Sequence, residues 1–207
     1  ILEDADLEKA VKSGVMHMYN NSGQSCNAPS RMLVPSAKLA EAEEIAAEVS
    51  KKVVVGDPKA EGTTMGPVVS EVQFEKIQGL IEKGISEGAK LVTGGPGRPD
   101  GLNQGFYVRP TVFSEANNDM TISREEIFGP VLTMIPYDSE EEAIQIANDT
   151  EYGLAAYVQS SDLDKARKIA SKLRAGNINL NGAGQTPNLP FGAVSYTHLT
   201  LPTTWLV

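Results

Sequence analysis

The chain has 207 residues, of which 41% are hydrophobic and 22% charged, and its formal net charge is −9. This is the composition of a globular chain that can bury a sizeable core, and the acidic balance argues against nucleic acid or an anionic membrane as a partner, because both favour a basic face. No apolar run approaches the roughly 20 residues of a membrane span, and the single cysteine excludes an internal disulfide, which fits a reducing, cytoplasmic compartment.

The first predicted element is a helix that Asp4 or Asp6 can cap. Apolar residues then recur at helical spacing, at Leu7, Ala10, Val11, Val15 and Met18. The polar stretch over residues 20–23 is expected to end this helix. His17 lies within it and is interpreted as structural, because no other residue supports a metal site or a cysteine–histidine pair.

The next stretch, residues 21–28, reads Asn-Ser-Gly-Gln-Ser-Cys-Asn-Ala and holds the only cysteine, Cys26. Gly23 permits a sharp turn, and Pro29 is acceptable in the first turn of a helix, so Cys26 is predicted at a helix N-terminus. There the helix dipole would favour the thiolate, which attacks carbonyl carbon, and nearby N–H groups could hold the resulting oxyanion. The alternative is a buried, inert cysteine.

Strands and helices alternate along the rest of the chain. Strands are predicted over residues 31–34, 90–93, 107–113, 131–137, 154–159 and 177–180, with 51–55 as a strand or an extended loop. Helices are predicted over residues 39–49, 70–85, from 139 onward and over 163–173. Capping boxes mark two helix starts, one from Ser70 to Gln73 and one from Ser139 to Glu142. The alternation predicts an α/β fold, a mostly parallel sheet with helices on both faces, in one domain.

Residues 125–131 form a second informative stretch, in which two carboxylates, an aromatic side chain and a Gly-Pro turn lead into a strand. The carboxylates either cap the preceding turn or are simply solvated. Alternatively, one of them accepts hydrogen bonds from a ribose while Phe128 covers an aromatic ligand ring.

The pattern Asn-x-Gly-Gln-x-Cys-x-Ala resembles the nucleophile motif of the NAD(P)-dependent aldehyde dehydrogenases, and residues 125–131 resemble a second hallmark of that family. The resemblance runs from residue 1 to 192 and implies the catalytic domain of an enzyme that oxidises an aldehyde to a carboxylic acid. In the implied mechanism, Cys26 attacks the aldehyde, the thiohemiacetal passes hydride to NAD or NADP, and water cleaves the acyl-thioester. The parent enzyme is expected to be a homo-oligomer.

The resemblance also implies roles for individual residues. Glu126 would hydrogen-bond the nicotinamide ribose, and Phe128 would pack beside the nicotinamide. Gln73 and Lys76 are similar to family residues that touch the adenine-side ribose, although a capping box and a solvated helix face explain them equally well. No metal site is expected.

Two residues are assigned to the substrate. Phe191, between Pro190 and Gly192, would line the aldehyde tunnel, although simple packing also explains an aromatic residue there. Gln24, two residues before the cysteine, is expected to contact the aldehyde.

The general base, the oxyanion-hole asparagine and the nucleotide-binding half of the family enzyme are expected upstream of Ile1. The chain is therefore expected to be an incomplete enzyme that is inactive alone. After Gly192 the family pattern stops, and residues 193–207 carry no charged side chain. This tail is expected to be a cloning or assembly artefact, with a natural terminal strand as the alternative, and His198 within it is interpreted as incidental.

Two other functions stay open at this point. One is a non-catalytic α/β module with a binding or assembly role. The other is a relative in which coenzyme A, rather than water, releases the acyl group.

Overall fold

A computed structural model describes residues 1–183 of the chain. Its main sheet has four strands in the order β1 (Arg31–Pro35), β4 (Val131–Tyr137), β3 (Thr111–Ser114) and β2 (Lys90–Thr93). β4 pairs in parallel with both β1 and β3, whereas β2 is antiparallel to β3. Every residue of β4 except Pro136 is buried, as is typical of a strand that is covered on both faces.

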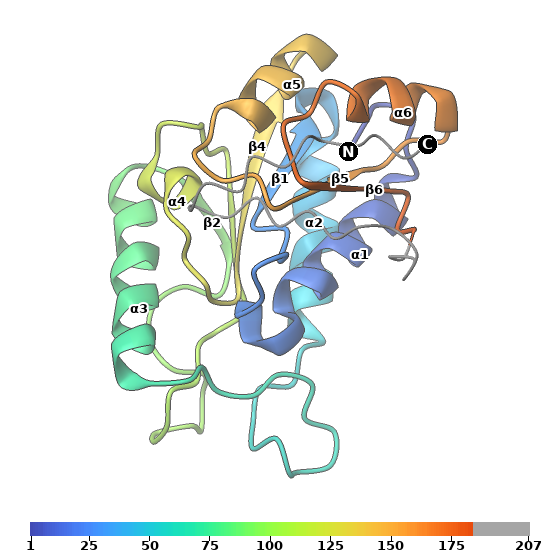
Figure 1. Ribbon diagram of the computed structural model, residues 1–207. Coiled ribbons are helices and arrows are strands. Elements are labelled where there is room, and N and C mark those ends of the chain that lie inside the picture. The colour runs from blue at the N-terminus through green and yellow to red at the C-terminus, as the bar shows by residue number, and fades with distance from the viewer. Residues whose placement is uncertain (184–207) are drawn as a thin grey trace.

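Helices cover both faces of this sheet (Figure 1). Helices α1 (Leu7–Tyr19) and α2 (Leu39–Lys51) pack on one face, where their apolar stripes meet Leu132 and Met134 of β4. Helices α3 (Glu71–Ser86) and α4 (Thr121–Arg124) pack on the other face, against Val131 and Ile135. Alternate β4 residues thus enter two different cores, and the predicted α/β fold with a mostly parallel sheet is confirmed.

A second sheet follows in the chain and does not join the first. After helix α5 (Glu140–Asn148), strands β5 (Ala155–Val158) and β6 (Asn177–Leu180) pair in parallel, and helix α6 (Leu163–Ala170) connects them. This pair has its own small core, formed by Leu2, Val158, Ala166, Ile169 and Ala170. The alternation of elements had indicated the class of the fold, but it does not specify which strands pair.

Several predicted boundaries are wrong by a few residues. The strand expected over residues 107–113 begins only at Thr111, because Pro110 has no N–H to donate; the first hydrogen bond of this segment to its neighbour joins Thr111 N to Pro130 O at 2.9 Å. Residues 51–55 are mostly irregular, with one isolated bridge between Val55 and Met65. Helix α4 and the short 3₁₀ helix η1 (Asn20–Gly23) were not predicted.

Of the two candidate caps, Asp6 begins α1, since its side chain accepts a hydrogen bond from Lys9 N at 3.1 Å. Asp4 instead accepts from the N–H groups of Ser161 and Asp162, at 2.8 and 3.1 Å, and so fastens the N-terminal segment to the start of α6. In both predicted capping boxes the N-cap serine makes the expected hydrogen bond: Ser70 accepts from Gln73 N, and Ser139 accepts from Glu142 N.

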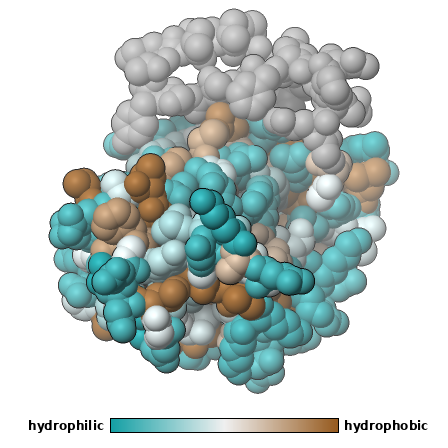
Figure 2. All heavy atoms as spheres, turned by 90° about the horizontal axis from the view of Figure 1, so that it is seen from below, coloured by the Kyte–Doolittle hydropathy of each residue, from teal (hydrophilic) through white to brown (hydrophobic). Residues whose placement is uncertain are grey.

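Hydrophobic side chains also reach the surface. Seen from below, they lie between hydrophilic ones over one face of the molecule (Figure 2). Val69 and Val72, on either side of the N-cap of α3, are 81% and 77% exposed. Within residues 1–183, no helix is long and apolar enough to cross a membrane. The predicted domain end at 192, the tail 193–207 and Phe191 lie outside the described residues.

Candidate active site

The segment that carries the cysteine, called here the cysteine loop (residues 20–30), leaves α1 through a tight bend. Three consecutive residues have positive φ: Asn21 at 52°, Ser22 at 56° and Gly23 at 73°. A side chain at Gly23 would clash, because a Cβ built there lies 2.1 Å from the carbonyl oxygen of Gly129. Glycine is therefore required at this position by both conformation and space, and the two informative stretches of the sequence touch through their backbones.

Cys26 is exposed and lies in a turn that is closed by a 2.9 Å hydrogen bond from Ala28 N to Ser25 O. The prediction that it begins a helix is wrong. Pro29 and Ser30 run directly into β1 at Arg31, so no residues remain for a helix after the cysteine. The thiol is presented by a turn rather than by a helix N-terminus.

The cysteine loop is also anchored to the segment that precedes α3. Ser22 Oγ donates to Gly66 O at 2.8 Å, and Val69 N donates to Gln24 Oε1 at 2.8 Å. The other end of the Gln24 amide, Nε2, donates to Asn21 O at 3.1 Å. Both ends of this side chain are thus engaged within the protein, and its contact with an aldehyde stays a prediction.

The carboxylate turn (residues 125–130) is anchored to the core through the buried side chain of Ile127. Ile127 is 2% exposed and packs in the same core cluster as Ile77 of α3. Its neighbours Glu126 and Phe128 line a cavity instead. Phe128 has φ 54°, a conformation that costs roughly 1–3 kcal/mol for a residue other than glycine and persists only where its surroundings hold it.

Two side chains of α3 hold this turn. Gln73 Nε2 donates to Ile127 O and Phe128 O at 3.0 and 2.8 Å, and Lys76 Nζ donates to Glu126 O at 2.7 Å. Three consecutive carbonyl groups of the turn therefore accept hydrogen bonds from one helix. Gln73 and Lys76 were predicted to touch the adenine-side ribose; the structure directs their donors to the turn, and contact with a cofactor stays a prediction.

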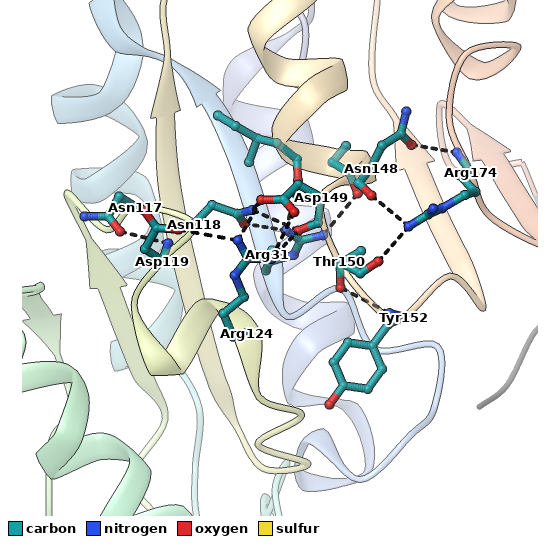
Figure 3. Close-up of polar contacts among 12 residues, drawn as sticks. Arg31, Asn117, Asn118, Asp119, Arg124, Asn148, Asp149, Thr150, Tyr152 and Arg174 are labelled. Atoms are coloured by element: carbon teal, nitrogen blue, oxygen red, sulfur yellow. Dashed lines mark hydrogen bonds and ion pairs between the residues drawn. The ribbon is translucent and has the colours of Figure 1, made fainter.

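A third side chain, Tyr152, reaches the turn from the other direction and was not predicted. Glu126 N donates to the Tyr152 hydroxyl at 3.1 Å. The loop before Tyr152 belongs to a polar network, in which Arg124 donates to Asp149 at 2.6 Å (Figure 3). The hydrogen bond from Arg124, and then that from Asn118, lowers the pKa of the Asp149 carboxyl below its ordinary value.

Tyr157 of β5 was also not predicted, and it contacts the cysteine loop. Its hydroxyl donates to Asn27 O at 2.7 Å, next to the cysteine. The ring meets His17 edge-on, with 5.1 Å between ring centroids, so His17 has the structural packing that was expected. Burial raises the pKa of Tyr157, so the hydroxyl stays protonated and can donate.

These elements surround a cavity of about 1070 Å³, which is lined by, among others, Cys26, Asn27, Glu126, Phe128, Tyr152 and Tyr157. Its volume slightly exceeds the range of roughly 300–1,000 Å³ that is usual for small-molecule sites. A carboxylate and an aromatic ring on the wall that also carries a thiol could hold the ribose and flat ring of a nicotinamide nucleotide. Among the residues that the structure describes, no cluster of His, Cys, Asp and Glu could bind a metal ion.

The structure places Cys26, Glu126 and Phe128 in the lining of one cavity, and their roles as nucleophile and cofactor contacts stay predictions. It places Gln73 and Lys76 against the carbonyl groups of the carboxylate turn. The two tyrosines were missed because nothing near either one in the sequence points to a partner that lies far away in the chain.

Comparisons with known proteins identify similar sequences and structures. The family described as "Aldehyde dehydrogenase family" matches residues 1–197. A 3-succinoylsemialdehyde-pyridine dehydrogenase from Pseudomonas sp is 57% identical over 192 residues, and a putative aldehyde dehydrogenase from Staphylococcus haemolyticus is 49% identical over 192 residues. In both cases the match covers 93% of this chain but 40% of the relative, so the chain spans about two fifths of the length of these relatives.

Solved structures give the same result. A cysteine-to-alanine mutant of aldehyde dehydrogenase C from Pseudomonas syringae, complexed with NAD⁺ and octanal, has 55% identity and a TM-score of 0.90. The match covers 92% of this chain and 39% of that one. An aldehyde dehydrogenase from Mycobacterium tuberculosis complexed with NAD⁺ has 45% identity and a TM-score of 0.89, over 93% of this chain and 40% of that one.

Proposed function

The chain belongs to the aldehyde dehydrogenase family, and from this we propose that it supplies the nucleophile and the nicotinamide side of an enzyme that oxidises aldehydes to carboxylic acids with NAD or NADP. One observation carries the proposal. The cavity has Cys26, Glu126 and Phe128 in its wall, although the thiol and the carboxylate turn are far apart in the sequence.

Cys26 acts as the nucleophile. Its exposed position in a turn lets an aldehyde approach, and the thiolate sulfur forms a bond to the carbonyl carbon while the π electron pair moves to the oxygen. Backbone N–H groups of the turn help to hold the oxyanion of this thiohemiacetal. When bound, NAD⁺ or NADP⁺ accepts the hydride that leaves the same carbon, and an acyl-thioester remains on Cys26. Water then cleaves the thioester, which gives the acid and frees the thiol.

Glu126 and Phe128 orient the cofactor. The Glu126 carboxylate would accept hydrogen bonds from the hydroxyl groups of the nicotinamide ribose, and the Phe128 ring would pack beside the nicotinamide. Both residues lie on the same short turn, so movement of that turn displaces both contacts. Misplacement by about 1 Å can cost on the order of a hundredfold in rate.

Residues 1–192 form the family's catalytic domain in this proposal, without the nucleotide-binding half, and the tail 193–207 is foreign to it. The match to the Pseudomonas relative spans 192 residues, and the family match runs to residue 197. Location in the cytoplasm and assembly into a homo-oligomer at natural length stay part of the proposal.

The test uses the protein at its natural length with octanal, since the Pseudomonas syringae relative was solved with that aldehyde. NADH should form, and Cys26→Ala should abolish it. Glu126→Gln should slow hydride transfer in a single turnover by on the order of a hundredfold, while the iodoacetamide labelling rate of Cys26 stays the same. An enzyme that still forms NADH after Cys26→Ala would disprove the proposed nucleophile.

A further inference from the structure

Two tyrosine hydroxyls connect the second sheet to the two parts of the site. Tyr152 lies in the loop that leads into β5, and Tyr157 lies within β5. The Tyr152 hydroxyl accepts from Glu126 N at 3.1 Å, and the Tyr157 hydroxyl donates to Asn27 O at 2.7 Å. Both bonds go to backbone groups, so each tyrosine fixes the path of a loop rather than the rotamer of a reacting side chain.

The two tyrosines are themselves held firmly. Tyr157 pairs with Asn179 of β6, and its ring packs edge-on against His17 of α1. Tyr152 N donates to Thr150 Oγ1 at 3.2 Å, and Arg174 donates to Thr150 O at 2.8 Å. Figure 3 shows the Tyr152 ring extending away from this network, and its hydroxyl reaches the carboxylate turn.

The residues that the tyrosines hold are those that matter most for the proposed reaction. Asn27 is the direct neighbour of the nucleophile Cys26, and Glu126 is the residue assigned to the ribose. The cysteine loop and the carboxylate turn both contain residues with positive φ, which adopt that conformation only when their surroundings support it. A change at either tyrosine should therefore release one loop and leave the other in place.

We propose that Tyr152 and Tyr157 are positioning residues, which set the distance between thiol and cofactor by tying the cysteine loop and the carboxylate turn to one short segment of the chain. The inference rests on the proposed function for its effect on catalysis, but the two contacts exist without it. Tyr157 positions the nucleophile, and Tyr152 positions the ribose-binding carboxylate. Neither takes part in a bond-making step.

The experiment compares Tyr152→Phe and Tyr157→Phe in the protein at its natural length. Tyr107→Phe is the matched control, since Tyr107 is half-buried and does not line the cavity. Each variant loses one hydroxyl and keeps its ring. Three quantities are measured: the alkylation rate of Cys26 by iodoacetamide, the hydride-transfer rate in a single turnover with octanal and NAD⁺, and hydrogen exchange at the Glu126 amide.

Each variant is expected to affect a different quantity. Tyr157→Phe should change the alkylation rate by roughly three- to tenfold and leave exchange at Glu126 unchanged. Tyr152→Phe should leave the alkylation rate as it is, accelerate exchange at Glu126, and slow hydride transfer by roughly three- to tenfold. Tyr107→Phe should match the wild type in all three.

Equal changes of all three quantities in both variants would mean a general structural role and would overturn the proposal, as would no change in either variant. If the wild-type protein forms no NADH, the proposed function fails. Alkylation of Cys26 and exchange at Glu126 still decide the positioning role in that case, because neither needs a bound cofactor.

Discussion

The cysteine loop and the carboxylate turn touch at Gly23 and Gly129, but they are held in different ways. The cysteine loop depends on backbone geometry: three consecutive residues have positive φ, and Gly23 leaves no room for a side chain. The carboxylate turn has one strained residue, Phe128, and side chains from other elements hold it, namely Gln73, Lys76 and Tyr152. The cysteine loop should therefore be sensitive to added atoms as well as to loss of the Tyr157 hydrogen bond, whereas the carboxylate turn should be sensitive chiefly to lost hydrogen bonds.

This difference also explains how each region could serve the chemistry. A nucleophile must be exposed and in one conformation, and a backbone that allows few alternatives provides both without covering the thiol. A ribose-binding carboxylate must be fixed in position while its side chain stays open to the ligand. Hydrogen bonds to the carbonyl and N–H groups of the turn achieve this, because they leave the Glu126 side chain free to face the cavity.

The largest expected effect is on aldehyde oxidation by the 207-residue chain, in which the cysteine loop and the carboxylate turn are present without the rest of a dinucleotide site. The 207-residue chain, purified as it stands, should oxidise no aldehyde, although iodoacetamide should still label Cys26. Orientation of reactants supplies roughly 7–11 kcal/mol of barrier lowering, and the carboxylate turn would contact only part of the cofactor. The sequence contains no Gly-x-Gly-x-x-Gly turn to bind a pyrophosphate.

The measurement is NADH formation with octanal and saturating NAD⁺, with labelling of the thiol as a parallel control. Turnover that disappears in Cys26→Ala would show that the cysteine loop and the carboxylate turn suffice for catalysis. That outcome would contradict the view that the turn needs further partners to hold a dinucleotide.

The next largest effect is expected from alanine substitution of Gly23, where both a positive φ and a close neighbouring atom oppose a side chain. Gly23→Ala should lower the free energy of unfolding by about 2–5 kcal/mol, because it adds strain at positive φ to a clash with Gly129. Gly62→Ala is the matched control, since Gly62 has φ 85° with no atom near a Cβ, and it should cost about 1–2 kcal/mol. Urea unfolding measures both, and equal losses would mean that the contact between Gly23 and Gly129 is unimportant.

The sequence predicted much of the fold because most strands are marked by local signals. The bounds of β2, β4 and β6 match the predicted ranges, and those of β1 differ by one residue. Within residues 1–183, β5 and β6 pair only with each other; this could not be predicted, because it depends on which surfaces meet and not on local propensity. Pro29 does not decide the structure after Cys26, since proline is compatible both with a helix start and with an extended segment.

For the site, the residues that face the cavity were recognisable and their supports were not. Cys26, Glu126 and Phe128 stand in motifs that are readable on their own. Tyr152 and Tyr157 act on residues far away in the chain, and such pairs cannot be inferred from a single sequence. The role of α3 in holding the turn was hidden for the same reason.

A smaller effect should follow from loss of the side chains that hold the carboxylate turn. Gln73→Leu removes two hydrogen bonds and should lower the free energy of unfolding by about 1–3 kcal/mol, because the half-buried carbonyl groups of Ile127 and Phe128 lose their donor. Lys76→Met removes one bond from an exposed side chain and should cost under about 1 kcal/mol. Thermal or urea unfolding tests the ranking, and a larger loss in Lys76→Met would contradict it.

The smallest effect on stability is expected from the Asp149–Arg124 ion pair, which lies outside the carboxylate turn. Asp149 lies in the loop that carries Tyr152. Its carboxylate is 2.6 Å from the Arg124 guanidinium, and this ion pair helps to fix the loop (Figure 3). Asp149→Asn should lower Tm by only about 1–2 °C at neutral pH, because the pair is solvent-accessible. Asp119→Asn is the matched control: it removes a longer contact of 3.4 Å with the same guanidinium and should lower Tm less.

The pH dependence of this difference gives the sharper test. The hydrogen bond from Arg124 lowers the pKa of Asp149 in the folded protein below the value of 3.8 that it has when unfolded. A carboxylate of this kind adds stability above its unfolded pKa and loses it as the pH falls through the folded pKa. The Tm difference between wild type and Asp149→Asn should therefore be constant from about pH 7 to about pH 5 and vanish at lower pH. A difference that persists in strong acid would mean that the amide disturbs the loop by its shape, and the carboxylate turn would then not depend on this charge.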